Sequence, residues 1–339
     1  MHVVAAPDKF RGTLTASDVA AALARAAEAA GARVDAVPVA DGGEGTLAAL
    51  GGPNRRTVVT GPLGDLVEAG WRCSTAGSPP QAVLEMALAS GLDLVGGAQG
   101  NDAVAASTHG TGELVAAALD AGCRRIILGV GGSASTDGGL GALRALEPLA
   151  RLRGVELVVG CDVHTTFVDA ARVFAPQKGA SPAQVELLHR RLERLAQVYQ
   201  QAHGADVRAI PGSGAAGGLA GGLAAVGARL VAGFDLVAEE VGLHDRLEAA
   251  GLVVTGEGFL DDQSFAGKAV GGVVELARAA EVPVLVVAGE VLEDVELPPG
   301  IAVVSLVERY GRDRALHETA ACIEEVVAAH LASPGEVDR

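Results

Sequence analysis

Glycine recurs along this sequence beside Ser or Thr, an acidic residue, or a single Lys or Arg, in segments that mostly follow a short apolar run. Glycine lets backbone N–H groups approach a phosphate, carboxylates can hold Mg²⁺, and Lys or Arg neutralises phosphoryl charge. Together these groups indicate phosphoryl transfer. The segments are residues 5–12, 38–46, 108–113, 131–139, 160–163, 176–180, 211–218 and 255–264.

One of these segments also matches a dinucleotide-binding fingerprint. Gly212, Gly214 and Gly217 have the spacing G-x-G-x-x-G, and Asp235 follows at roughly the right distance. That fingerprint must follow a buried strand, and residues 205–210 make a poor one. An NAD-dependent oxidoreductase of small hydroxy acids therefore stays open as an alternative function.

A P-loop of the Walker type is not present in the sequence. Gly267 and Lys268 are followed by Ala269 rather than Ser or Thr, and Asp262 occupies the position of the first glycine. If this chain is a kinase, it binds its phosphates by another arrangement.

The elements that must position these loops alternate between short apolar runs and Ala-rich helical stretches, which predicts an α/β fold with parallel sheets. In such sheets ligands bind beyond the carboxyl ends of the strands, where many of the glycine segments lie. Thr15 and Asp18 form a capping box that opens a helix ending at Gly31. Ser181 caps a long helix over residues 182–203. The predicted strands are residues 3–6, 34–39, 82–85, 126–130, 157–160, 252–255, 284–288 and 303–307.

The length of 339 residues suggests two domains, and no long polar linker divides the chain. Because the first and last thirds have the clearer strand–helix rhythm, we expect residues 1–60 and 246–339 to form one discontinuous α/β domain. Residues 61–245 would then be a second α/β domain inserted into it.

Composition excludes several classes of protein. The hydrophobic content of 49% supports sizeable cores, and a net charge of −16 argues against partners such as nucleic acid or an anionic membrane. The four cysteines are scattered, which favours reduced thiols and a cytoplasmic protein. The sequence gives no basis for assigning an oligomeric state.

The ordered set of loops resembles the bacterial-type glycerate kinase family. The resemblance rests on residues 39–46 (VADGGEGT) and 84–92 (LEMALASGL), followed in the family's order by the other glycine segments up to Lys268. It implies two α/β domains, one of them flavodoxin-like with a parallel sheet, and an active site in the cleft between them. It also implies ATP and Mg²⁺ as cofactors, D-glycerate as the small-molecule substrate, and phosphoglycerate, with 2-phosphoglycerate favoured, as the product.

On this resemblance we assign roles within the loops as a hypothesis. Asp162 would orient or deprotonate the attacking hydroxyl, while Lys178 and Lys268 would neutralise the transferring phosphoryl group. The remaining predicted contacts fall into three sets. Lys9, Arg11, Asp41 and Glu44 would bind glycerate; Gly132, Ser133, Thr136, Asp137, Gly212, Ser213, Gly214 and Gly217 would bind the nucleotide; Glu257 and Asp261 would hold the metal ion.

The segment after Asp162 departs from the family pattern. Residues 164–167 read His-Thr-Thr-Phe where the family has Asn-Pro-Leu and a following glycine. A non-catalytic metabolite-binding protein on the same fold is therefore a further alternative.

Overall fold

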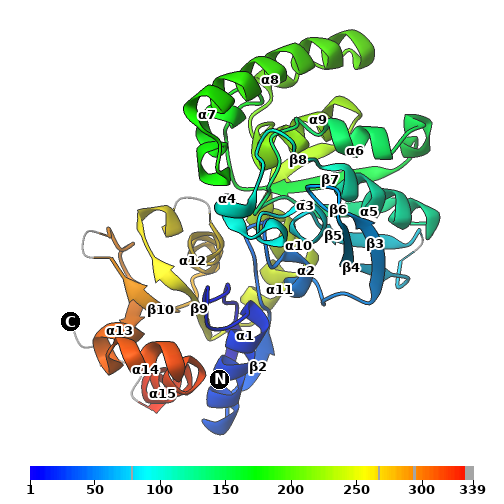
Figure 1. Cartoon of the computed structure of the whole chain (residues 1–339). Coiled ribbons are helices and arrows are strands. Elements are labelled where there is room, and N and C mark those ends of the chain that lie inside the picture. Colours follow the sequence, from blue (N-terminus) through cyan, green and yellow to red (C-terminus); the bar gives the residue numbers. More distant parts are fainter. Residues whose placement is uncertain (78, 266–267, 293–294, 333–339) are drawn as a thin grey trace. The chain divides into compact units, whose positions relative to one another are not determined.

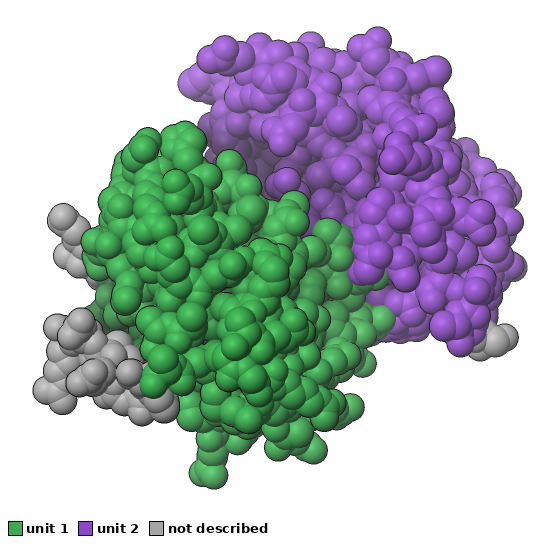
Figure 2. Space-filling view, turned by 90° about the horizontal axis from the view of Figure 1, so that it is seen from below, with its two compact units in different colours: residues 1–41, 48–50, 234–339 green, residues 42–47, 51–233 purple. Residues whose placement is uncertain are grey.

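The computed structural model describes residues 1–77, 79–265, 268–292 and 295–332 (Figure 1). The chain forms two compact units, coloured separately in Figure 2. Unit 1 comprises residues 1–41, 48–50 and 234–339, and unit 2 comprises residues 42–47 and 51–233. The sequence of unit 2 is therefore inserted into that of unit 1.

Unit 1 contains a five-stranded parallel sheet in the order β11-β10-β9-β1-β2. Counted along unit 1 from the β2 edge, this is the flavodoxin-like order 2-1-3-4-5. Its strands are β1 (His2–Ala5), β2 (Arg33–Ala36), β9 (Leu252–Leu260), β10 (Val284–Val291) and β11 (Ala302–Ser305). Its helices are α1 (Ala16–Ala29), α10 (Gly233–Glu240, whose first residue is assigned to unit 2), α11 (Leu243–Glu248), η6 (Asp262–Phe265), α12 (Ala269–Ala279), α13 (Leu306–Tyr310), α14 (Arg312–His317) and α15 (Thr319–Ala332). Helix α2 (Thr46–Ala49) also contains residues of both units.

The central strands β1, β9 and β10 are buried on both faces, which explains why they read as continuous apolar runs. On β1, Val3 packs in the core formed with α1 and α15, whereas Val4 packs in the core formed with α11 and α12. Alternate side chains of these central strands therefore pack in two different cores.

Unit 2 contains a six-stranded mixed sheet in the order β3-β4-β5-β6-β7-β8, with β3, β4 and β5 antiparallel and β5 to β8 parallel. Its strands are β3 (Arg55–Thr60), β4 (Leu66–Ser74), β5 (Gln81–Glu85), β6 (Arg125–Gly129), β7 (Glu156–Cys161) and β8 (Arg229–Ala232). Its helices are α3 (Ala87–Ser90), η1 (Asp93–Val95), α4 (Gly97–Gly100), α5 (His109–Asp120), α6 (Leu140–Ala145), η2 (Leu149–Leu152), α7 (Ala170–Phe174), η3 (Pro176–Lys178), α8 (Pro182–His203), η4 (Val207–Ala209), η5 (Ala215–Gly218) and α9 (Leu219–Ala225).

The buried parallel strands were predictable from sequence, and each predicted strand coincides with an observed one. The prediction for residues 303–307 is wrong at its end, because Ser305 caps a new helix that begins at Leu306. Strands β3, β4 and β8 were missed. In β3, Arg55 and Arg56 are exposed, so this strand carries no continuous apolar signal.

The predicted helix ends are confirmed. The Thr15 hydroxyl accepts a hydrogen bond from the Asp18 N–H, and the Asp18 carboxylate accepts one from the Thr15 N–H. Ser181 and Gln184 form a second capping box at the start of α8, and Gly204 ends that helix in the left-handed conformation.

The two units divide the chain elsewhere than at the boundaries expected from sequence. Residues 51–60 belong to unit 2, because β3 pairs with β4 along its whole length. Residues 234–245 belong to unit 1, where Phe234, Val237 and Leu243 join the core around α12.

Candidate active site

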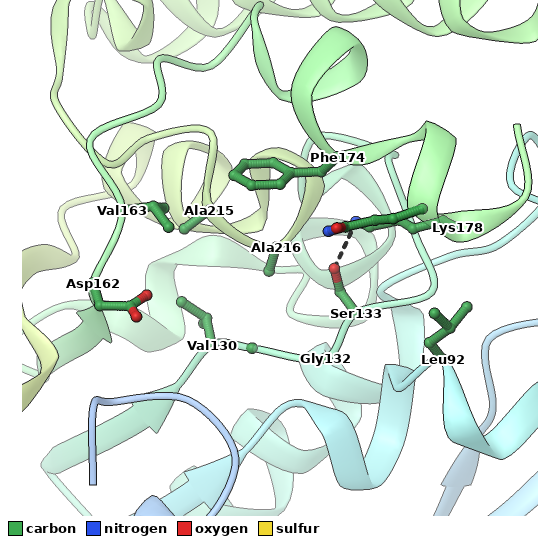
Figure 3. Close-up of a pocket in the computed structure, with 12 residues that line it drawn as sticks. Leu92, Val130, Gly132, Ser133, Asp162, Val163, Phe174, Lys178, Ala215 and Ala216 are labelled. Atoms are coloured by element: carbon green, nitrogen blue, oxygen red, sulfur yellow. Dashed lines mark hydrogen bonds between the residues drawn. The ribbon is translucent and has the colours of Figure 1, made fainter. Parts of the chain in front are cut away.

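A cavity of about 320 Å³ lies in unit 2 where β6 and β7 end (Figure 3). Residues 131–133 follow β6, and Asp162 follows β7, so the cavity occupies the position at which open α/β sheets bind ligands. Figure 3 shows Asp162 and Lys178 on different sides of this space. The lining residues are Leu92, Val130, Gly131, Gly132, Ser133, Asp162, Val163, Phe174, Gln177, Lys178, Ala215 and Ala216.

Lys178 is the buried cation of this cavity. Its side chain leaves the 3₁₀ turn η3, and only 3% of the residue is exposed. The Nζ atom donates hydrogen bonds to the Ser133 hydroxyl at 2.7 Å and to the Ser135 carbonyl at 2.6 Å. Burial lowers the pKa of Lys178 to about 7, against a smaller opposing effect of the Asp137 charge. Lys178 can therefore bind an anion as a cation or release its proton near neutral pH.

Asp162 supplies a carboxylate on the wall of the same cavity. It is exposed, whereas the preceding residue, Cys161, is buried at the end of β7. Burial and the charge of Asp162 raise the pKa of the Cys161 thiol to about 11. Cys161 is therefore protonated at neutral pH, and Asp162 is the group here that could accept a proton.

The loop after β6 divides into two parts. Gly132, with φ of 61°, and Ser133 reach the cavity. Asp137 instead holds the loop together: its carboxylate accepts hydrogen bonds from the N–H groups of Thr108, Gly139 and Gly141 and from the Thr108 hydroxyl. Asp137 thus shapes the loop without lining the cavity that contains Lys178.

The loop at residues 211–218 packs behind this cavity, and only Ala215 and Ala216 line it. Gly217 has φ of 66°, and a Cβ there would collide with the backbone of Ser135. The predicted nucleotide contacts Gly212, Ser213, Gly214 and Gly217 are not among the lining residues.

The same loop lacks the context of a dinucleotide fingerprint. Residues 205–210, all of them described, contain the 3₁₀ turn η4 and no strand. The fingerprint requires a buried strand directly before its glycines. The structure therefore gives the NAD interpretation no support.

The unusual segment after Asp162 supports both glycine loops. The Thr165 carbonyl accepts a hydrogen bond from Gly214 N–H at 2.9 Å. Phe167 is fully buried and meets the Tyr199 ring edge-on at 6.0 Å, and the Tyr199 hydroxyl donates to the Gly138 carbonyl at 2.9 Å. The residues that depart from the family pattern therefore pack against both glycine loops and hold them in place.

Unit 1 brings carboxylates together near the ends of β1 and β9. Burial raises the pKa of Glu257 to about 7; Ser264 and Lys268 oppose this effect, and Asp8 and Asp261 add to it. The Oε1 atom of Glu257 is buried and accepts no hydrogen bond from the described part of the chain. This carboxylate is therefore suited to bind a proton or a cation.

Asp8 belongs to the same group of carboxylates, and no role was predicted for it from the sequence. It is 7% exposed, and its carboxylate accepts a hydrogen bond from Lys9 N–H at 2.7 Å. Burial raises the pKa of Asp8, the Lys9 charge lowers it, and the Asp41 charge raises it again. Its position immediately after the first strand, in Pro7-Asp8-Lys9, was the available signal.

The predicted cations of unit 1 differ in their surroundings. Lys9 is mostly buried, with Nζ 3.6 Å from Asp8 Oδ1, and Arg11 is exposed. Lys268 Nζ lies 4.0 Å from Asp261 Oδ1, which also accepts hydrogen bonds from Ser264. Gly267, beside Lys268, lies outside the described residues.

The predicted glycerate ligands Asp41 and Glu44 belong to different units. Asp41 is the last residue of the first segment of unit 1, and Glu44 is exposed in the part of unit 2 that begins at residue 42. The backbone around Glu44 is held by Glu85, a second residue for which no role was predicted from the sequence.

Among the described residues, no group of three or more His, Cys, Asp or Glu side chains is arranged to hold a metal ion. No helix in the described ranges has the length and apolarity needed to cross a membrane.

Comparisons with known proteins agree with one another. The glycerate kinase family matches residues 3–149 and 147–333. Glycerate 2-kinase of Escherichia coli (strain K12) is 39% identical over 335 residues, covering 87% of each chain, and glycerate kinase of Bacillus subtilis (strain 168) is 39% identical over 332 residues, covering 87% of this chain and 86% of the relative. A crystal structure from Salmonella typhimurium LT2, described as a candidate glycerate kinase 2, superposes with a TM-score of 0.83 at 33% identity, covering 98% of this chain and 97% of the other.

Proposed function

Since this chain belongs to the glycerate kinase family, whose members are ATP-dependent kinases, we propose that it transfers the γ-phosphate of ATP to D-glycerate, forming 2-phosphoglycerate and ADP. The observation that carries the proposal is Lys178, a buried cation bonded to Ser133 beside a cavity that also contains Asp162. Phosphoryl transfer needs such positioned charge more than it needs covalent chemistry.

In unit 2 the proposed roles follow from what each group can do. Gly132 N–H and the Ser133 hydroxyl would bind phosphate oxygens, and Lys178 in its charged form would neutralise the transferring group. The Asp162 carboxylate would accept the proton of the attacking glycerate hydroxyl. The apolar neighbours Val130, which is buried, and Phe174, which is partly buried, would limit the access of water, which would otherwise compete as the acceptor.

In unit 1 we propose that the cations and carboxylates near the strand ends bind the substrate and the metal ion. Lys9 and Arg11 would pair with the glycerate carboxylate, and Asp41 would accept hydrogen bonds from its hydroxyls, a role we also give to Glu44 of unit 2. Lys268 would contact phosphoryl oxygens.

The proposed Mg²⁺ ligands fit a magnesium ion in their chemistry. Mg²⁺ binds proteins through one or two carboxylates and completes its shell with water and substrate phosphates, so a larger cluster is not required. Glu257 has a buried oxygen without a hydrogen-bond partner among the described residues. When bound, the ion would neutralise charge on the phosphate chain. We expect Asp261→Asn to raise the Mg²⁺ concentration needed for half-maximal activity.

A direct assay tests this function. The purified protein is incubated with ATP, Mg²⁺ and D-glycerate, ADP formation is followed, and phosphorus NMR identifies the product. We expect ADP to form only when glycerate is present, and the phosphorus signal of the product to come from a phosphate at the 2-position. Tight glycerate binding with no turnover would instead support the non-catalytic alternative. Production of 3-phosphoglycerate would overturn the proposed position of phosphorylation but not the proposed reaction.

We also propose the cytoplasm as the compartment of this activity. All four cysteines are free and buried, including Cys73 and Cys123, whose sulfur atoms lie 3.7 Å apart in a hydrogen bond and not in a disulfide. Unpaired neighbouring thiols are what a reducing compartment maintains.

A further inference from the structure

A second cavity in unit 2, of about 490 Å³, runs along α8 and shares none of the lining of the first. Its surface is mainly aliphatic and includes Leu192 and Leu195 of α8 and Leu140 of α6. Three arginines of α8, at positions 190, 191 and 194, also line it. An apolar slot with several cations suits a ligand that has a flat apolar part and an anionic part.

We propose that this cavity binds the nucleoside end of the phosphoryl donor, so that the adenine ring of ATP or ADP lies against the leucines and the arginines face its phosphates or stack on the ring. The inference rests on the proposed function, because that function requires a nucleotide. It adds the location of the base, which neither the family resemblance nor the first cavity provides.

The loop after β6 links the two cavities. Ser133 lines the first cavity, while Thr136 and Asp137 line the second. Three residues of extended chain span at most about 11 Å. A nucleoside triphosphate is elongated, so its base and its terminal phosphate can contact different parts of one loop. With this arrangement, the cavity that contains Lys178 needs to hold only the terminal phosphate of the nucleotide and not its base.

Charge complementarity supports an anionic ligand. The chain as a whole carries −16, yet Arg190, Arg191 and Arg194 meet along one cavity. Arg191 donates a hydrogen bond to the Val104 carbonyl at 3.1 Å, and Arg194 donates one to the Gln197 side chain at 2.9 Å. Both acceptors are neutral, so these bonds do not neutralise the positive charges of the two arginines. A phosphate approaching an acidic protein would be attracted to such a site.

Thr136 provides an independent observation. It is 1% exposed, it lines the cavity, and its hydroxyl has no hydrogen-bond partner among the described residues. Burying a hydroxyl without a partner is unfavourable, so a bound ligand that supplies the partner would remove this cost. A ring nitrogen of adenine is an acceptor of the required kind.

The test measures ADP binding directly by calorimetry, with kinase assays alongside. We expect Arg190→Glu and Arg194→Glu each to weaken ADP binding and raise the KM for ATP about tenfold or more, with the KM for glycerate unchanged. Arg153→Glu, at an exposed arginine outside the cavity, is the matched control and should bind ADP as the wild type does.

Thr136→Val is the second variant, because it removes the hydroxyl while keeping the shape of the side chain. It should weaken ADP binding severalfold without lowering the melting temperature, a combination that a purely structural role would not give. Unchanged ADP affinity in all three cavity variants would overturn the inference. If the wild type binds ADP but transfers no phosphate to glycerate, the proposed function fails. The ADP affinities of the same cavity variants then still decide whether the cavity binds the nucleoside. If the wild type binds no ADP, both fail.

Discussion

Glu85 holds Gly45 in place through a hydrogen bond of 3.1 Å from the Gly45 N–H to the Glu85 Oε1 atom, and its Oε2 atom accepts an equal bond from Leu47 N–H. Glu85 ends β5 and is 5% exposed. A buried carboxylate needs partners of this kind, because an unpaired charge is expensive to bury. The loop of unit 2 that carries Glu44 is therefore fixed to the sheet by Glu85.

We predict that Glu85→Gln raises the KM for glycerate more than it lowers kcat. The glutamine amide group replaces one acceptor oxygen with a donor, which then faces a backbone N–H. The free energy of unfolding should fall by about 1–3 kcal/mol. Steady-state kinetics and chemical denaturation measure the two effects.

Glu113→Gln is the matched control for this change. Glu113 also accepts a hydrogen bond from a backbone N–H, that of Thr60 at 2.6 Å, but this bond holds the end of β3 and not the loop that carries Glu44. It should lose stability and keep the wild-type KM. A KM in Glu85→Gln that matches the control would show that Glu85 is structural only.

The sequence predicted the parallel strands well because burial on both faces leaves a continuous apolar run, as in β1 and β10. It failed for β3 and β4, which form an antiparallel pair with exposed positions such as Val58, and for the parallel edge strand β8, in which no residue is fully buried. The unit boundary near residue 234 was also missed, because Phe234 joins its core through packing that no local pattern records.

For the candidate site, the loops could be predicted from the sequence, but the roles of the individual residues within each loop could not. Ser133 and Asp137 lie in one loop, yet Ser133 lines the first cavity and Asp137 binds backbone N–H groups. Residue types cannot distinguish these roles, because a carboxylate suits either. The importance of Glu85 depends on contacts with residues about forty positions earlier in the chain, which only the folded sheet creates.

Asp162→Asn should lower kcat by about 10²–10⁴-fold if Asp162 accepts the proton of the attacking hydroxyl. Asparagine keeps the size of the side chain but cannot accept a proton at neutral pH, so the KM values should change little. Rapid-quench measurement of ADP formation isolates this step from product release. A kcat close to that of the wild type would remove Asp162 from the proposed mechanism.

Glu257→Gln should raise the Mg²⁺ concentration needed for half-maximal activity. Because burial raises the pKa of Glu257 to about 7, the wild-type carboxylate becomes charged as pH rises through 7, and apparent Mg²⁺ affinity should increase over that range. The glutamine variant should lack this dependence. Glu290→Gln, at a partly exposed position of β10, is the control, and an identical Mg²⁺ titration in both variants would exclude Glu257 as a ligand.

Lys178→Met should abolish most phosphoryl transfer, because methionine fills the space without charge. In the wild type, the cationic form is lost as pH rises through about 7, so kcat/KM should decline above that pH. The pH profile of kcat/KM measures this. A profile that stays flat from pH 6 to 9 would contradict a requirement for the charged form of Lys178 in the free enzyme.

The same substitution should increase stability near neutral pH. The pKa of Lys178 falls from 10.5 to about 7 on folding because burial disfavours the charged form. Between these two values the unfolded chain binds more protons than the folded one, so this group makes stability rise with pH by up to about 1.4 kcal/mol per pH unit. Lys178→Met removes that dependence. The difference in unfolding free energy between variant and wild type, measured by denaturation at pH 7, 8 and 9, should therefore favour the variant most at pH 7 and shrink as pH rises; a constant difference would show that Lys178 stays charged in the folded protein.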